Sequence, residues 1–132
     1  MDSIRVTMAP NEELLIGNVV ATNVGAQTAE LSIMGTGPIL RREQILDAKD
    51  AITPALKIYY LVTSLYIHPS LFAQLNPVLS ELSRDMVLAV PSSGEFIADI
   101  GEAVAVGDYR LAHQSAQELL HFEQALEDLA AK

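Results

Sequence analysis

The spacing of hydrophobic residues changes once along this chain, from a period of two before Leu40 to a helical period after Thr53. Ile4, Val6 and Met8 alternate with polar residues, which is typical of a half-buried strand. The alternation returns several times before Leu40, and Gly, Asn and Pro residues interrupt it at short intervals. The first part of the chain is therefore predicted to form a small antiparallel β-meander of four or five short strands, at residues 4–8, 14–16, 19–21, 31–33 and 39–41.

One turn of this meander is marked by Gly17-Asn18, which separates two apolar segments. Both residue types tolerate a positive φ, as a two-residue hairpin turn requires. A sheet this small cannot close a core of its own. We therefore expect it to pack on helices or to pair with another subunit through its open edges.

After Thr53, apolar residues recur at helical spacing up to the C-terminal region, which predicts about four α-helices. The expected boundaries are a Thr53 cap followed by Pro54, a stop at His68-Pro69, a kink or restart at Asn76-Pro77, a Ser92/Glu95 capping box, and a Gly107 stop with an Asp108 cap. The predicted fold class is α+β, with a β-rich head over residues 1–50 and a helical body over 51–132 in one compact unit.

Composition narrows the class of protein. With 132 residues the chain has the length of a single domain, and it contains no cysteine, which excludes disulfides and thiolate metal sites. We find no apolar run near the roughly 20 residues of a membrane span and no signal-peptide pattern at the N-terminus. We expect a cytoplasmic protein without a membrane partner. The hydrophobic share of 50% in so short a chain suggests burial against a partner or a second copy.

The net charge of −9 argues against indiscriminate nucleic-acid binding, which depends on cations at phosphates. The helical body is the more acidic part, because residues 95–132 carry eight acids and two bases, against seven and four in residues 1–51. A site for an anionic partner is therefore expected in the first third. Arg41 and Arg42, adjacent at the end of the last strand, are the candidates together with Arg5 on the first strand. Pairing of Arg41 and Arg42 with Glu43 or Asp47 is the structural alternative.

No residue pattern supports an enzyme, a cofactor or a metal. His113 and His121 are eight residues apart on one predicted helix, whereas a pair of metal ligands needs i, i+4 spacing. Gly35-Thr-Gly37-Pro38 lacks the lysine and the helix that follow a phosphate-binding loop.

Three tyrosines, Tyr59, Tyr60 and Tyr66, lie on the first predicted helix. They would either stack on nucleic-acid bases or line the contact between head and body with their hydroxyls at solvent.

The sequence resembles the FlbT family of flagellin regulators from alphaproteobacteria over nearly its whole length. The matching segments are Glu13-Leu-Leu-Ile-Gly-Asn18, Gly37-Pro-Ile-Leu-Arg41, Gln44-Ile-Leu46, Thr53-Pro-Ala55, Lys57-Ile-Tyr-Tyr60, Leu65-Tyr-Ile67 and Gly107-Asp-Tyr109. The segment 38–67 is the specific part.

The head alone is similar to the CsrA-like RNA-binding regulators, through Asn11-Glu-Glu-Leu-Leu-Ile-Gly17 and Arg42-Glu-Gln-Ile45. The resemblance implies an intertwined dimer that grips RNA with basic residues of its first and last strands. The last-strand arginine falls on Arg42. The first-strand basic pair falls on Met8 and Ala9, so that half is missing, and Arg5 is the candidate substitute.

The FlbT resemblance implies a post-transcriptional regulator that binds the 5′ untranslated leader of flagellin mRNA and controls its translation and decay, in balance with the protein FlaF. The alternative is an adaptor whose acidic body binds FlaF or flagellin, with only an indirect effect on the mRNA. We expect a homodimer.

Overall fold

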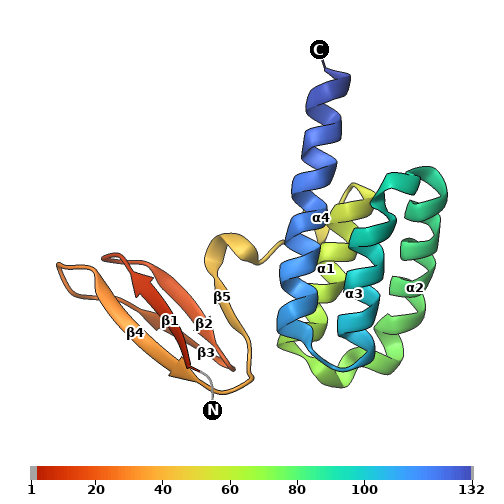
Figure 1. Cartoon of the computed structure of the whole chain (residues 1–132). Helices are drawn as coiled ribbons and strands as arrows, with labels where there is room; N and C mark the ends of the chain where they lie inside the picture. The colour runs from red at the N-terminus through yellow and green to blue at the C-terminus, as the bar shows by residue number, and fades with distance from the viewer. Residues whose placement is uncertain (1–2, 132) are drawn as a thin grey trace. The chain divides into compact units, whose positions relative to one another are not determined.

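The computed structural model describes residues 3–131 and shows strands followed by helices, which confirms the α+β class (Figure 1). The chain divides into a strand unit, Met1–Ile45, and a helical unit, Leu46–Lys132. The strands are β1 Ser3–Met8, β2 Glu13–Ile16, β3 Val19–Thr22, β4 Ala29–Met34 and β5 Ile39–Arg41. The helices are α1 Pro54–Ile67, α2 Phe72–Ala89, α3 Gly94–Ala105 and α4 Tyr109–Ala130, with short 3-10 turns at Arg42–Gln44, Ala48–Asp50, Pro69–Leu71 and Pro91–Ser93.

The strand unit consists of two small antiparallel sheets rather than one sequential meander. β1 pairs with β4 in the first sheet, and the second has the order β3-β2-β5. The hairpin predicted at Gly17-Asn18 is confirmed, with Ile16 opposite Val19. Among the described residues of this turn only Gly17 has a positive φ, of 64°. Only β2 and β3 are both adjacent in sequence and paired, so most of the pairing joins distant segments.

The strand unit buries few of its apolar side chains completely. Met8, Leu14 and Leu40 are buried, and the inner-facing Ile4, Val6 and Ile33 are only partly covered. A loop built on Asn23 holds the strand ends together, since its side-chain amide donates to the carbonyls of Met8, at 2.8 Å, and Gln27, at 2.9 Å. Polar contacts therefore carry much of the connection inside this unit.

The helical unit has a continuous core in which α1 is central. Its face Ile58, Val62 and Leu65 is fully buried, and it packs on α2 and on α4. Thr53 caps α1 as predicted, because its hydroxyl oxygen accepts the amide N–H of Leu56 at 3.2 Å. Glu123 of α4 strengthens this cap by accepting the amide N–H of Ala55 at 3.2 Å.

Two other predicted boundaries turn out differently. The Ser92/Glu95 capping box is wrong, because α3 has Ser93 at its N-cap without a side-chain cap, and that hydroxyl donates to the Val90 carbonyl oxygen at 2.6 Å. Pro77 lies inside a continuous α2, so the helix does not restart there. The Asp108 cap of α4 is confirmed, since its carboxylate accepts the amide N–H of Leu111 at 3.1 Å.

A buried polar cluster joins α1 to α4. His113 is 3% exposed, and its Nε2 lies 3.2 Å from the hydroxyl oxygen of Tyr59. The ring of Tyr66 packs on His113, and its hydroxyl oxygen accepts a hydrogen bond from Nε of Arg110 at 2.9 Å. Burial lowers the pKa of His113 to about 4, so the imidazole stays neutral in the folded chain at neutral pH. Among residues 3–131, no helix is both long and apolar enough to cross a membrane.

We expect acid to destabilise the protein through His113. The unfolded chain takes up this proton near pH 6.5 and the folded chain only near 4, so stability present above pH 6.5 is lost as the pH falls through that window. Between pH 7 and pH 4, wild type should lose up to about 3 kcal/mol more free energy of unfolding than His113→Gln. Urea titrations at both pH values measure this. The exposed His121→Gln is the control and should follow wild type; equal losses in all three proteins would contradict the assignment.

Candidate nucleic-acid interface

Arg41 ends β5, and its guanidinium is engaged inside the strand unit. Nη1 lies 2.9 Å from Oε1 of Glu12, and Nη2 donates to the backbone carbonyl oxygen of Thr7 at 3.1 Å. Since Thr7 belongs to β1 and Arg41 to β5, this side chain links the two sheets. The Arg41 side chain is 31% exposed, so solvent reaches part of it. We interpret the main role of Arg41 as a structural link between the two sheets.

Glu12, the ion-pair partner of Arg41, was not identified from the sequence. It lies in the turn between β1 and β2, where Asn11 has a positive φ of 68°. The same Oε1 accepts the amide N–H of Ala9 at 3.1 Å, so the carboxylate is fixed before it meets Arg41. Glu12 and Arg41 are far apart in sequence, and only the pairing of Leu14 with Arg41 in neighbouring strands brings them together. Local spacing pointed to Glu43 and Asp47 instead.

Arg42 has a different environment from its neighbour. It opens the 3-10 turn Arg42–Gln44, and its side chain is 82% exposed. The nearest carboxylate oxygen is Oε2 of Glu13, at 4.0 Å from Nη1, which is a weak, solvent-screened contact. The backbone around it is well fixed, because the amide N–H of Arg41 donates to Oε1 of Gln44 at 2.7 Å. A rigid turn therefore presents a guanidinium to solvent.

Arg5 lies on the exposed face of β1, opposite Ser32 of β4. It is two residues from Thr7, so about 7 Å of strand separates it from the carbonyl that Arg41 contacts. Within residues 3–131, Arg5 makes no ion pair. The structure thus leaves Arg42 and Arg5 open to solvent and places Arg41 between structural partners.

Carboxylates share this surface with the arginines. Glu12 and Glu13 contact Arg41 and Arg42, and Glu30 and Glu43 are exposed within the same unit. An anion here would meet a few fixed guanidinium groups rather than a broad positive field. Such a surface favours specific contacts over the non-specific binding that an extended basic patch provides.

Tyr59 and Tyr66 are not available to stack on nucleic-acid bases. Tyr59 and Tyr66 are 5% and 4% exposed, and both hydroxyls form contacts with α4, so the expected position of these hydroxyls at solvent is wrong. Burial also raises the pKa of Tyr59 above its usual value. In the part of the chain that the structure describes, no group of His, Asp and Glu side chains is placed to hold a metal ion.

Comparison with known proteins gives the family. The model of the family described as flagellar protein FlbT matches residues 4–126. The chain belongs to the FlbT family. A probable flagellum biosynthesis repressor protein FlbT 1 of Bradyrhizobium diazoefficiens is 38% identical over 125 residues, covering 94% of this chain and 84% of the relative. Probable flagellum biosynthesis repressor proteins FlbT from two strains of Rhodopseudomonas palustris are 32% identical over 123 residues, covering 93% of this chain and 96% of each relative. No solved structure matches the chain.

The match to the FlbT family model includes the arginine-bearing strand, the contacts of Arg41 and most of α4. The likeness therefore extends over both units rather than over the CsrA-like segment alone. A function assigned to this FlbT-family chain therefore has to account for both the strand unit and the helical unit.

Replacing Arg41 should destabilise the strand unit, whereas replacing Arg42 should not. Arg41→Ala removes a partly exposed ion pair and a link to the Thr7 carbonyl, and we expect a loss of about 1 kcal/mol. Hydrogen exchange of the β1 and β4 amides measures this directly. Arg42→Ala is the matched control, and Arg41→Lys should recover only part of the loss because an ammonium cannot reproduce the guanidinium fork. Equal exchange rates in Arg41→Ala and Arg42→Ala would contradict the structural role.

Proposed function

We propose that this FlbT-family chain regulates flagellin synthesis after transcription, by binding the 5′ untranslated leader of flagellin mRNA in the cytoplasm and controlling its translation and stability. The names of the relatives as flagellum biosynthesis repressors support a regulatory role. The observation that carries the RNA contact is the guanidinium of Arg42, 82% exposed on a hydrogen-bonded turn at the end of β5. An exposed arginine can contact phosphates and also the edges of unpaired bases, which proteins read in RNA loops.

Arg5 is the proposed second contact, and Arg41 the residue that positions the surface. Arg41 links β5 to β1. Since β1 carries Arg5 and Arg42 directly follows β5, this link fixes the positions of Arg5 and Arg42 relative to one another. Two arginines per chain are few for RNA binding, since each phosphate contact contributes modestly. A homodimer would double them.

A dimer through the strand unit is part of the proposal. β3 is an edge strand of its sheet, and its Val19 and Val20 are 58% and 61% exposed, so a second copy could pair along it. Partly covered inner residues such as Ile4 and Ile33 would gain burial against a second copy. Light scattering should then give twice the 14.3 kDa mass of one chain.

Arg42→Ala should weaken binding of flagellin leader RNA about tenfold in a gel shift. Four phosphate contacts in a dimer predict a log–log salt slope of roughly −3, at about 0.7 per contact on single-stranded RNA. Arg42→Ala removes two of the four and should halve that slope. The control is Arg84→Ala, which removes an exposed arginine from α2 of the helical unit and should leave both values unchanged.

An unchanged affinity and slope in an Arg5→Ala/Arg42→Ala double variant would reject direct RNA contact. The second candidate function is then an adaptor that binds FlaF or flagellin. The acidic excess of the helical unit favours it, because residues 95–132 carry eight acids against two bases. A gel shift that appears only when the protein partner is added would support the adaptor.

A further inference from the structure

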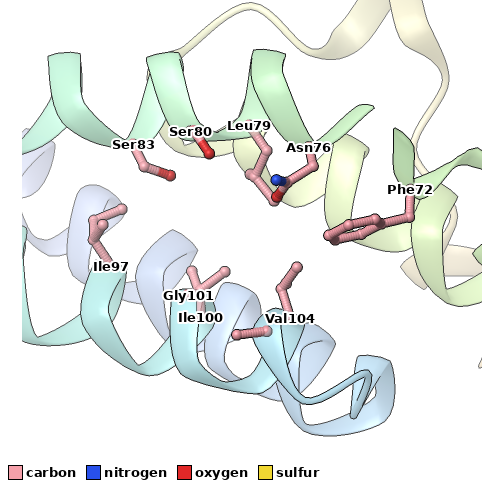
Figure 2. Close-up of a pocket in the computed structure, with 10 residues that line it drawn as sticks. Phe72, Asn76, Leu79, Ser80, Ser83, Ile97, Ile100, Gly101 and Val104 are labelled. Atoms are coloured by element: carbon pink, nitrogen blue, oxygen red, sulfur yellow. The ribbon is translucent and has the colours of Figure 1, made fainter. Parts of the chain in front are cut away.

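The helical unit contains an open groove between α2 and α3 (Figure 2). α1 packs on α2 and α4, and α3 packs on α4, but α2 and α3 make little direct contact. The ring of helix contacts that closes a four-helix bundle is therefore open at one position. The groove at this position has a volume of about 360 Å³.

The two walls of the groove differ in chemistry. Ile97, Ile100 and Val104 of α3 form an apolar wall, and Phe72 closes one end, as Figure 2 shows. The α2 wall carries the polar side chains of Asn76, Ser80 and Ser83, at i, i+4 and i+7 along the helix. Within residues 3–131 these three side chains make no hydrogen bond, so they are free to bond to a ligand. An occupant must therefore offer one apolar face with polar groups beside it.

Gly101 is an exposed position beside the groove and leaves open space there. It lines the groove from α3, and a Cβ at this position would meet no atom within 4 Å. From Ile97 to Ala105 the groove follows α3 for about 12 Å, at 1.5 Å per residue, which is about two helical turns. This length and openness suit the apolar stripe of a helix better than a small molecule, which needs enclosure on most sides.

The surrounding charge selects the kind of helix. Exposed acids occur along both helices of the groove, and Arg84 is the one base among them: the acids are Glu81, Asp85, Glu95, Asp99 and Glu102. None of these acids forms an ion pair within residues 3–131. A second copy of this chain presents mainly acidic helices and would be repelled, as would an anionic membrane surface or RNA. A cationic partner would be attracted.

We propose that the α2–α3 groove is the docking site for a basic amphipathic helix of a partner protein. Its apolar residues, spaced i, i+4 and i+7, would lie against Ile97, Ile100 and Val104 and fill the space above Gly101. Its lysines or arginines would face the carboxylates of α2 and α3, and its polar flank would meet Asn76, Ser80 and Ser83. This site does not depend on RNA contact by the strand unit.

The test uses the full chain and a fluorescent helical peptide of about 15 residues, long enough to form a helix on binding, with leucines at i, i+4 and i+7 and lysines on the other face. A second peptide has glutamates in place of the lysines, and a third has the leucines scattered around the helix. Fluorescence anisotropy should show micromolar binding of the first peptide and about tenfold weaker binding of the other two.

Gly101→Leu should lower the affinity for the basic peptide about tenfold, because the new side chain fills the groove. The variant should unfold at the same or a higher temperature, since glycine is a poor helix residue, so misfolding would not explain the loss. Gly101→Ala improves the helix without filling the groove, and Ala125→Leu adds the same bulk to an exposed site of α4; both should bind as wild type does.

The proposal is overturned by absence of binding, by equal affinity for the acidic or scattered peptide, or by full affinity in Gly101→Leu. Binding of leader RNA by Gly101→Leu distinguishes the two proposals. That variant should retain the RNA shift, and Arg42→Ala should retain the peptide. A failed peptide test with an intact RNA shift therefore leaves the proposed function untouched.

Discussion

The bridge from Arg41 to Glu12 and the Thr7 carbonyl is the interaction on which the arrangement of the strand unit depends. Two sheets of two and three strands bury too little apolar surface to hold one another firmly. A guanidinium suits the task because its planar fork reaches a carboxylate and a carbonyl at the same time. The cost is functional, because an arginine committed to this link is less available to a ligand. The adjacent Arg42 takes no part in the link, and its side chain is 82% exposed.

The different environments of these adjacent arginines show which features could be predicted from the sequence and which could not. Strand existence, the Thr53 cap and the Asp108 cap depend on neighbours within a few residues, and local patterns predicted them. The partner of Arg41 depends on which strands pair, and β2 with β5 is a non-local choice that alternation does not encode. The Ser92 capping box was wrong because the chain makes a 3-10 turn at Pro91–Ser93 and α3 starts one residue later than expected. The site was therefore predictable as a location, but not in its geometry.

The tyrosines are a second case in which a local sequence pattern does not give the tertiary partner. Tyr59 and Tyr66 are seven residues apart and lie on one side of α1, but such spacing alone is compatible with a surface or a core. What decides is the residue brought opposite by α4, and that residue is His113. A neutral histidine between two tyrosines satisfies its polar atoms without a charge, so it can be buried at little cost. The three rings thus serve the packing of α1 on α4.

The distribution of charge makes two separate partner surfaces physically reasonable. The strand unit presents the guanidinium groups of Arg5 and Arg42 at solvent among carboxylates, while α2 and α3 carry acids without internal ion pairs. An anion would be repelled by the second surface and a cationic helix would gain nothing from the first. Each surface consists of residues of one unit alone. The groove borders the core, because Leu79, Ile100 and Val104 line the groove and also belong to the hydrophobic cluster around α1. An open space lined by Gly101 and by hydroxyls that bond to no protein group is easier to explain as a binding surface than as a requirement of the fold.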